Sequence, residues 1–588
     1  MKSRTGVAVA ALAALTLVAA GCSKSSSPGS TSSGNATVKS GFNAAVGGGI
    51  VSPSDKKGGT LKLVNSADAD SYDPARAYYA WLWNMQRFYI RTLVAPQGKP
   101  GKDGLKLVND LAASQDVSAD GLTYTYKLKD NIKFEDGSAI TSKDIKYGIE
   151  RGFAQDVLSG GPTYLSEQLD QGQKYPGPYK DSDPAKMGLK SVDTPDGKTI
   201  VFHLKSPFAD FPYLLAMGPA APVPMAKDTG DKYSSHPIAS GPYMFKSIEV
   251  GKKVVLVRNP NWVQSTDPIR KALPDEIDLA LQVDVNEIDN ELMDGTADLD
   301  TGQVGVQPAA QAKILTNPDL KKNADEPNTG FIRYAALSTQ VAPFDNKDCR
   351  IAVQYAIDKV AIQTVRGGPD AGGNIGFNML PPNIDGHDPN YAPYTGKSGQ
   401  PDLQKAKDAL TKCGKPNGFS TVIAARNKGK EPKVAEAVQQ ALSKIGITAT
   451  IDSSDPALYF RSTIGSPDNV HKKGYGIMIA GWGADFPTGF GYLDVLVDGD
   501  KILPSGNNNY EELNDPAVQA LIKQALASTD PTKTADLWRQ INVKVMESAS
   551  LVPFVYDKAL NYRNPRLTNV YEDEYYGMID FQALGVQS

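Results

Sequence analysis

Alternation of apolar and polar residues predicts several short strands along the chain. The first is 58–64 (GGTLKLV), and 122–128 (LTYTYKL) and 198–204 (KTIVFHL) alternate in the same way. An Asp-Gly pair stands directly before each of the last two segments. Because Asp-Gly beside an alternating run is typical of a tight turn between paired strands, both positions predict hairpins.

Other segments carry the 3.6-residue period of a helix. Residues 348–365 (DCRIAVQYAIDKVAIQTV) predict one helix, and 433–445 (KVAEAVQQALSKI) predict a second helix that ends at Gly446. The next residues, 447–451 (ITATI), alternate again as a strand. This succession of strands and helices predicts an α/β fold.

The N-terminus has the pattern of a secretory signal. Lys2 and Arg4 precede the apolar stretch 7–20, which ends in small residues and Cys22. The alternative is a transmembrane anchor, but the stretch is shorter than the roughly 20 residues that a spanning helix needs. Residues 18–22 (VAAGC) resemble a bacterial lipobox, and that resemblance implies cleavage before Cys22 and a lipid on its sulfur. We therefore expect a signal peptide over residues 1–22.

Residues 23–57 are rich in Ser and Gly and have no periodicity. Such a segment buries too little apolar surface to fold, so we expect a flexible tether. Behind a lipidated cysteine, the tether would hold a folded body near the outer face of a membrane. Several acyl chains would make that anchoring stable.

Composition narrows the function classes. The 588 residues are 22% charged and 40% hydrophobic, which is ordinary for a globular protein and unlike a multi-span membrane protein. The net charge of −4 gives no basic footprint, so we expect no nucleic acid partner. Four His and three Cys lie far apart along the chain, so we expect no metal site and no cofactor.

Two cysteines remain once Cys22 is assigned to lipid. Cys349 and Cys413 would lie in an oxidising compartment, where free thiols tend not to persist. We therefore predict a Cys349–Cys413 disulfide. The alternative is two separate buried thiols.

Six stretches together resemble the extracellular solute-binding protein family 5, the oligopeptide- and dipeptide-binding components of ABC importers. The longest, 111–151, combines two Asp-Gly turns, a strand and a helix in one run. In chain order the stretches are 58–75, 111–151, 240–262 (SGPYMFKSIEVGKKVVLVRNPNW), 343–359 (PFDNKDCRIAVQYAIDK), 481–489 (GWGADFPTG) and 551–556 (LVPFVY).

The resemblance implies a two-lobed periplasmic-binding-protein-like fold that closes over its solute by a hinge, with an extra domain inserted in the first lobe. Closure suits a carrier because the open form admits solute and the closed form is recognised by the transporter. In this numbering the expected parts are lobe I (58–82, 196–327 and 555–588), the inserted domain (83–195) and lobe II (328–554).

The resemblance also implies a binding site. In peptide-binding members the aspartate matching Asp485 pairs with the ligand's α-ammonium, and Gly483 and Ala484 are small enough for a ligand backbone to approach. Trp482 is a candidate ligand contact, and core packing is its alternative. The alternative for Asp485 is a loop-cap aspartate satisfied by neighbouring backbone amides.

Two weaker candidates lie near the first strand. The aromatic residues Tyr78, Tyr79, Trp81 and Trp83 either line a side-chain pocket or pack inside a lobe, and helical spacing favours packing. The acidic loop 65–73, which contains Asp70, either faces the cleft or is a solvated turn.

The resemblance implies a lipid-anchored, monomeric receptor on the outer face of the cell membrane that delivers peptides to ABC transporter permease subunits. One alternative is the same fold binding a non-peptide solute such as an oligosaccharide, a metal chelate or haem.

A second alternative is a cell-wall peptidase or hydrolase. The sequence has no H-E-x-x-H and no G-x-S-x-G, and its S-x-x-K match (54–57) lies in the expected tether. His387-Asp388 in a Gly/Pro/Asn loop lacks a companion nucleophile. We therefore expect no enzymatic activity.

Overall fold

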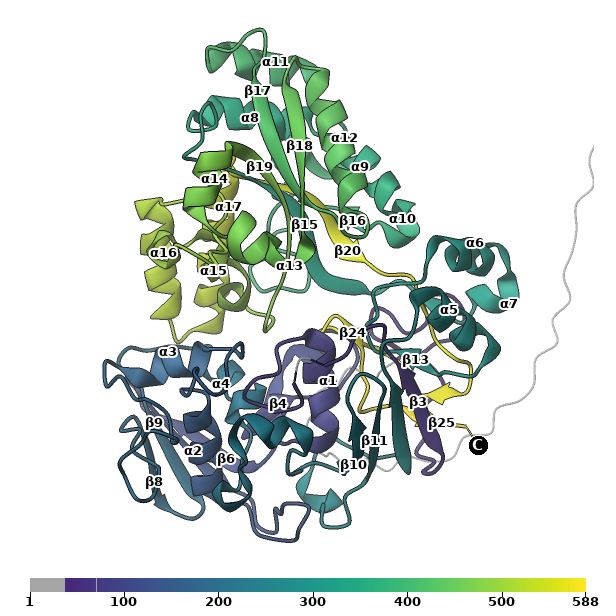
Figure 1. Cartoon of the computed structure of the whole chain (residues 1–588), viewed down its shortest axis with the longest axis vertical. Helices are drawn as coiled ribbons and strands as arrows, with labels where there is room; N and C mark the ends of the chain where they lie inside the picture. Colours follow the sequence, from purple (N-terminus) through teal and green to yellow (C-terminus); the bar gives the residue numbers. More distant parts are fainter. Residues whose placement is uncertain (1–36, 70, 588) are drawn as a thin grey trace, which may run out of the picture. The chain divides into compact units, whose positions relative to one another are not determined.

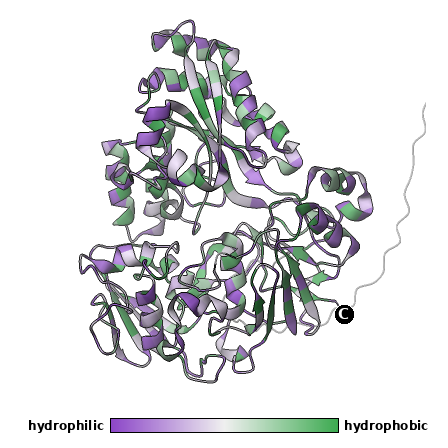
Figure 2. Ribbon diagram, in the orientation of Figure 1, coloured by the Kyte–Doolittle hydropathy of each residue, from purple (hydrophilic) through white to green (hydrophobic). Residues whose placement is uncertain are grey.

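The computed structural model describes residues 37–69 and 71–587. Among these residues the strands form three sheets of four or more strands, on which helices pack (Figure 1). Hydrophobic residues concentrate in the strands of the sheets, and hydrophilic residues are frequent on the helices and loops around them (Figure 2). The fold is α/β, as the sequence predicts.

A five-stranded sheet contains the first predicted strand, β3, between β12 and β13. β12 and β13 run parallel to β3, whereas β10 and β11 extend the sheet as an antiparallel pair. In spatial order its strands are β10 (Tyr243–Glu249), β11 (Lys253–Arg258), β12 (Glu276–Ala280), β3 (Thr60–Val64) and β13 (Leu299–Asp300).

A four-stranded antiparallel sheet contains both predicted hairpins. The turn at Asp120-Gly121 joins β6 to β7, and the turn at Asp196-Gly197 joins β8 to β9. In spatial order the strands are β6 (Ala112–Val117), β7 (Thr123–Leu128), β9 (Thr199–His203) and β8 (Val192–Asp196).

A six-stranded sheet is built around β15, which pairs antiparallel with β19 and β20. Alternate residues of β15 enter different cores: Ile332 and Tyr334 face one hydrophobic cluster, and Ala335 and Leu337 face another, as period-2 alternation requires. In spatial order the strands are β16 (Asn374–Ile375), β20 (Leu551–Lys558), β15 (Asn328–Leu337), β19 (Tyr475–Gly483), β17 (Ser420–Arg426) and β18 (Thr448–Ser454).

Short paired strands complete the sheet structure. They are β1 (Thr37–Val38) with β2 (Gly49–Ile50), β4 (Val94–Pro96) with β5 (Leu107–Asn109), β14 (Ala324–Asp325) with β21 (Asn561–Tyr562), β22 (Leu567–Thr568) with β25 (Gly585–Val586), and β23 (Glu572–Asp573) with β24 (Met578–Ile579).

Helices cover the sheets. Those before β15 are α1 (Ala80–Tyr89), α2 (Ser142–Arg151), α3 (Tyr164–Asp170), α4 (Phe211–Leu214), α5 (Val285–Asp294), α6 (Pro308–Thr316) and α7 (Pro318–Lys321). Those after β15 are α8 (Lys347–Ala356), α9 (Lys359–Arg366), α10 (Gly368–Ala371), α11 (Leu403–Lys412), α12 (Glu431–Ser443), α13 (Pro456–Leu458), α14 (Pro467–Lys473), α15 (Val495–Val497), α16 (Pro516–Leu526) and α17 (Pro531–Ser548).

Two segments carry the chain between the five-stranded and six-stranded sheets, and they lie side by side. β14 leads into β15, and β20 leads into β21. β14 pairs antiparallel with β21, and Asn328 of β15 lies opposite Lys558 of β20. A two-segment connection of this kind is the arrangement on which hinge closure acts.

Three predicted domain boundaries fall inside elements. The boundary at 82/83 cuts α1, whose Met85 and Phe88 belong to the core of the five-stranded sheet. The boundary at 195/196 assigns β9 to lobe I, although β9 pairs with β7 and β8. The boundary at 554/555 divides β20, which pairs with β15 along its length. The packing of α1 and the pairing of β9 and β20 therefore favour other positions for these three boundaries. The division into domains stays a prediction.

The expected flexible tether is wrong for residues 37–57. This segment forms β1 and β2, and its Ala44 and Ala45 are fully buried. Ala45 N donates to Asp325 Oδ1 (3.0 Å), and Ser54 N donates to Asn569 Oδ1 (2.8 Å). The segment is held by partners remote in sequence, which composition does not reveal. The predicted signal peptide, Cys22 and the rest of the tether lie outside the described residues.

The predicted helix over 348–365 is divided into α8 and α9. Asp358 lies at the break, and its side chain accepts a hydrogen bond from Ala361 N (2.9 Å), so it caps α9 instead of continuing α8. The predicted disulfide is confirmed, because Cys349 of α8 and Cys413, directly after α11, are bonded.

No helix among the described residues has the length and apolar character that a membrane crossing requires.

Reduction of the disulfide should lower stability without unfolding the core. The bond closes a separation of 64 residues, and a cross-link of that kind typically contributes about 2–4 kcal/mol to the free energy of unfolding. Urea denaturation with reductant should therefore shift the midpoint of the wild type to a lower concentration. The double variant Cys349→Ala/Cys413→Ala should be insensitive to reductant. An equal midpoint for the wild type with and without reductant would contradict a stabilising bridge.

Candidate functional site

The candidate site lies at the end of β19. The buried run 475–480 leads to Gly483, which lies opposite Phe331 of β15. A Cβ on Gly483 would lie 2.6 Å from the exposed Phe331 ring, so a larger residue here would have to displace that ring. Asp485 follows two residues later, in the loop beyond the strand.

Two tyrosines from other parts of the chain hold the Asp485 carboxylate. Tyr78 Oη donates to Asp485 Oδ2 at 2.6 Å, and Tyr164 Oη donates to the same oxygen at 2.5 Å. Tyr78 precedes α1, and Tyr164 is the first residue of α3. Asp485 therefore connects its own loop to two segments that lie 407 and 321 residues away from it in the sequence.

The charge of this carboxylate is not neutralised by a nearby cation. Burial raises the pKa of Asp485, and the hydrogen bonds from Tyr164 and Tyr78 partly oppose that rise. Burial and the negative charge of Asp485 also raise the pKa of both phenols, so they stay neutral donors. Among the described residues no ion pair includes Asp485. The Asp485 carboxylate therefore has hydrogen-bond donors but no cationic partner among the described residues.

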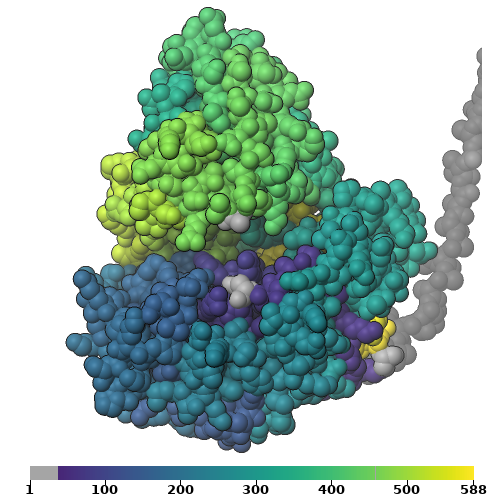
Figure 3. Space-filling model, viewed as in Figure 1, coloured from purple at the N-terminus to yellow at the C-terminus, as the bar shows by residue number. Residues whose placement is uncertain are grey.

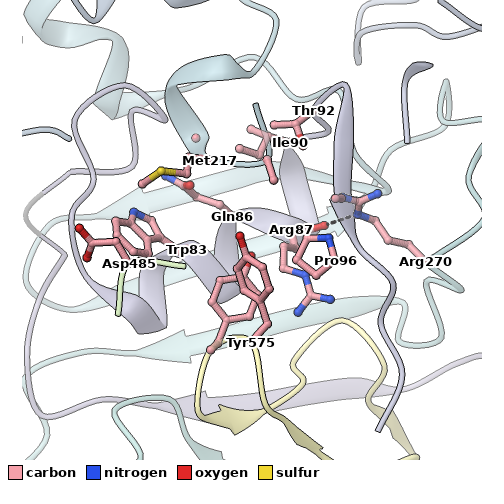
Figure 4. Close-up of a pocket in the computed structure, with 14 residues that line it drawn as sticks. Trp83, Gln86, Arg87, Ile90, Thr92, Pro96, Met217, Arg270, Asp485 and Tyr575 are labelled. Carbon is pink, nitrogen blue, oxygen red and sulfur yellow. Dashed lines mark hydrogen bonds between the residues drawn. The ribbon is translucent and has the colours of Figure 1, made fainter. Parts of the chain in front are cut away.

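Two cavities meet at Asp485. The first, here called the strand-side cavity, has a volume of about 190 Å³ and is lined by Tyr78, Tyr79, Phe331, Gly483 and Ala484, among others. The second, here called the helix-side pocket, has a volume of about 30 Å³ and lies along α1 (Figure 4). Trp83, Asp485, Tyr575 and Tyr576 line both. Figure 3 shows a hollow in the molecular surface directly below the part of the molecule that contains the six-stranded sheet, drawn mainly in green.

A family model described as "Bacterial extracellular solute-binding proteins, family 5 Middle" matches residues 106–503, more than half of the chain. The chain belongs to this family. The resemblance seen in the sequence is therefore confirmed. The two adjacent segments that connect the five-stranded and six-stranded sheets agree with the two-lobed fold of this family.

Relatives of this family 5 protein are named as binding proteins. "Probable D,D-dipeptide-binding periplasmic protein DdpA" of Escherichia coli (strain K12) is 26% identical over 86% of this chain and 89% of its own length. "Heme-binding protein A" of Haemophilus influenzae is 27% identical over 80% of this chain and 83% of its own length.

The solved structure of "Clavulanic acid biosynthesis oligopeptide binding protein 2" is 44% identical in sequence to this family 5 chain. It covers 94% of this chain and 99% of its own, with a TM-score of 0.90. A DppA structure from Helicobacter pylori is 22% identical, covers 91% of this chain and 99% of its own, and has a TM-score of 0.70, which supports the fold.

The structure brings together most of the residues that the sequence singles out in this family 5 protein. Tyr78, Gly483, Ala484 and Asp485 line the strand-side cavity. Trp482 packs against the hydrophobic core instead, and its position opposite Ile332 explains that packing. Asp70 lies outside the described residues. The alternative for Asp485, a cap on neighbouring backbone amides, is not observed among the described residues. The donors to its carboxylate are two phenol hydroxyls.

The aromatic cluster before α1 and within it is divided between core and cavity. Trp81 is 8% exposed and packs in the core of the five-stranded sheet. Tyr78, Tyr79 and Trp83 line the strand-side cavity, and the Tyr78 and Trp83 rings stack with centroids 5.3 Å apart. Trp81 therefore packs in a core, as predicted, and Trp83 both packs against a core and lines the cavity, whereas Tyr78 and Tyr79 line the cavity.

The acidic loop 65–73 is partly structural. Asp73 is 1% exposed, and both of its oxygens accept hydrogen bonds from Arg151, at 2.9 and 2.6 Å. A buried bidentate pair of this kind joins the loop to α2. The interpretation of a solvated turn is wrong for Asp73.

Sequence reasoning missed Tyr164, Phe331, Tyr575 and Tyr576. Each lies far along the chain from Asp485 or on another strand, and no local pattern marks it. His387, the candidate for a catalytic dyad, contacts the Leu380 carbonyl oxygen through Nδ1 at 2.6 Å. Within residues 37–69 and 71–587, no group of three or more His, Cys, Asp or Glu side chains is placed to hold a metal ion.

Removal of the Asp485 charge should not destabilise the ligand-free protein. The pKa of Asp485 is raised above the 3.8 of an exposed aspartate, so the folded state binds this proton more tightly than the unfolded chain does. Its contribution to stability therefore falls as pH rises through that range. Urea denaturation at pH 7 should give Asp485→Asn at least the wild-type free energy of unfolding, since Asn Oδ1 still accepts from both phenols.

The same comparison at pH 3 should bring the two proteins closer, because both side chains are then neutral. A marked loss of stability in Asp485→Asn at pH 7 would assign the carboxylate a structural role instead.

Proposed function

We propose that this protein captures peptides with a free amino terminus in the space beside Asp485 and delivers them to the permease subunits of an ABC importer. The single observation that carries the proposal is the Asp485 carboxylate, which is partly withdrawn from water and has phenols but no cation beside it. A peptide's α-ammonium supplies the missing positive charge. A charge-assisted hydrogen bond of this kind contributes about 1.5–3 kcal/mol.

The end of β19 offers a place for a peptide backbone. β15 pairs with β19 as far as Gly483, whereas the pairing of β17 with β19 stops where Ala424 lies opposite Met478. The last residues of β19 therefore have one edge without a strand partner among the described residues. An extended peptide can add to such an edge by main-chain hydrogen bonds, which recognise peptides irrespective of side chains.

The names of relatives agree with a peptide ligand. The 44%-identical structure is named an oligopeptide binding protein, and the Escherichia coli relative is named as D,D-dipeptide-binding. The relatives named here are binding proteins, and we propose that this chain likewise has no catalytic role.

The three-way contact at Asp485 supports the proposal that the protein closes over its ligand. Tyr78 precedes α1, Tyr164 begins α3 and Asp485 follows β19, so the site is complete only when these parts approach. A peptide that contacts all three favours the closed form by its differential affinity for it. We propose that the permease recognises this closed form, with the protein acting as a monomer.

We further propose that the protein is a lipoprotein held at the outer face of the cell membrane through Cys22. The motif at 18–22 and the preceding apolar stretch support this proposal, and both lie outside the described residues. The packed body begins by Thr37, so the linker behind Cys22 would be shorter than the sequence suggests.

Asp485→Asn should weaken the binding of peptides with a free amino terminus by roughly an order of magnitude or more, the scale of one lost charge-assisted bond. Isothermal titration calorimetry with a tetrapeptide measures this loss. The matched ligand is the same peptide with an acetylated amino terminus, which should bind weakly to wild type and be affected little by the substitution.

Unchanged affinity of Asp485→Asn for the free peptide would refute the ammonium site. Mass spectrometry of the peptide recovered after each titration should find it intact, and cleavage would favour the hydrolase alternative. A non-peptide solute released from the purified wild type on denaturation would favour the other solute classes.

Cys22→Ala should release the protein from the membrane. Two or more acyl chains give stable anchoring at about 0.8 kcal/mol per buried methylene, and the variant has no sulfur to carry them. In a bacterial host, wild type should partition into the detergent phase of Triton X-114 and the variant into the aqueous phase. Detergent partitioning of both proteins would favour an uncleaved transmembrane anchor.

A further inference from the structure

The N-terminal segment 43–47, here called the clasp, is bonded to the segment that connects β14 to β15. Asn43 N donates to Ala324 O at 3.0 Å, and Asn43 Oδ1 accepts from Glu326 N at 2.7 Å. Between these two bonds, Ala45 N donates to Asp325 Oδ1 at 3.0 Å. Two residues of the clasp therefore hold three consecutive residues of the connecting segment.

A glutamate near the C-terminus extends these contacts to the start of β15. Glu572 N donates to Ala45 O at 2.8 Å, and the Glu572 side chain accepts from Gly47 N at 3.4 Å and from Asn328 N at 2.9 Å. Glu572 is 4% exposed, so little water competes for these bonds. Backbone N–H groups of the connecting segment are thus fixed as far as Asn328, the first residue of β15.

The clasp belongs to the five-stranded sheet. Ala45 is fully buried in the hydrophobic core of that sheet. Phe42, directly before the clasp, packs against the cluster that contains Ile288 of α5, and Lys321 Nζ lies 4.7 Å from the centroid of its ring. The clasp is therefore a fixed part of the body on which the connecting segment rests.

Strand pairing is interrupted directly after the last residue that these contacts hold. Along β20, the pairing of β15 stops after Asn328 and resumes at Ile332. Among the described residues, Thr329 and Gly330 have no strand partner in β19 or β20. Gly330 has a φ of +73°, a conformation that favours glycine. A hinge absorbs rotation through φ/ψ changes at a few such positions, so the chain can turn at 329–330.

We propose that the clasp regulates closure over the ligand. It fixes the connecting segment up to Asn328, so that the two lobes turn at Thr329 and Gly330, and it stabilises the closed form. This inference concerns regulation of the proposed ligand site and rests on the proposed function.

The direction of the effect follows from which contacts occur together. The clasp bonds are present in the same structure as the bonds from Tyr78 and Tyr164 to Asp485, which bring the parts of the site together. Bonds that hold the connecting segment in this geometry favour this form over forms in which the segment moves. A ligand that binds the closed form then binds more tightly, because that form is more populated before the ligand arrives.

Asn43→Gly tests the clasp in the full-length protein. Asn43 has a φ of +58°, so glycine removes the acceptor of Glu326 N without straining the backbone. The matched control is Asn131→Gly, because Asn131 is an exposed asparagine with a φ of +57°.

Hydrogen exchange of the ligand-free proteins, measured by mass spectrometry, reports the connecting segment directly. Exchange in peptides that cover 324–330 should be roughly fivefold faster in Asn43→Gly than in wild type, the scale of one lost hydrogen bond. Asn131→Gly should exchange there as wild type does. Exchange in β3 should be the same in all three proteins, so that a change at 324–330 reports the hinge and not the fold. Equal exchange at 324–330 in both variants would overturn the clasp.

Calorimetry with a tetrapeptide that has a free amino terminus reports the ligand site. Asn43→Gly should bind roughly two- to fivefold more weakly than wild type, since only the bond energy that differs between the open and closed forms affects affinity. Asn131→Gly should keep the wild-type affinity. Equal or tighter binding by Asn43→Gly would refute the role of the clasp in closure.

The two proposals fail in distinguishable ways. If wild type binds no peptide, the proposed function fails, whereas the exchange comparison uses no ligand and still decides whether the clasp holds the connecting segment. If wild type binds the peptide and Asn43→Gly matches it in both measurements, the function stands and the clasp is wrong.

Discussion

The Asp485 carboxylate is held in a half-buried position by two neutral phenols, and the rest of the site is arranged around this carboxylate. A carboxylate in such a place favours protonation, as the raised pKa indicates, unless a cation arrives. In the part of the chain that the structure describes, its hydrogen-bond donors are the two phenols, and no helix cap or neighbouring backbone amide compensates the charge. The donors come from a segment before α1 and from α3. The hydrogen bonds to this one carboxylate therefore come from elements that pack on different sheets.

The effect of these contacts depends on how the sheets are connected. The paired segments β14 and β21 carry the chain between the five-stranded and six-stranded sheets, and Asn328 lies opposite Lys558 just beyond them. Glu572 accepts from Asn328 N at 2.9 Å and from Gly47 N at 3.4 Å, so the N-terminal segment is bonded to the same connection. Two adjacent antiparallel segments permit rotation about a common line more readily than independent motion. Rotation about that line moves Asp485 relative to Tyr78.

The parts of this structure that could be predicted from sequence are those with a local cause. β3 and the two Asp-Gly hairpins follow from period-2 alternation and turn chemistry, whereas Gly483, Ala484 and Asp485 were singled out by the resemblance to family 5. The break between α8 and α9 depends on whether Asp358 caps or continues a helix, which tertiary packing decides. The order in residues 37–57 comes from Asp325 and Asn569, hundreds of residues away. Tyr164 could not be found, because its role exists only once α3 reaches Asp485.

The choice of phenols as the partners of Asp485 has a physical consequence for ligand exchange. An arginine or lysine at either position would neutralise the carboxylate permanently, and a ligand ammonium would then have to displace a charge-assisted bond of equal strength. A phenol bonded to a carboxylate already makes a charge-assisted hydrogen bond, but it brings no positive charge to the site. An ammonium that replaces one phenol therefore adds the charge that the carboxylate lacks, and Tyr78 has Trp83 beside it as a stacking partner. The residues that hold the carboxylate thus leave its charge available to a cationic ligand.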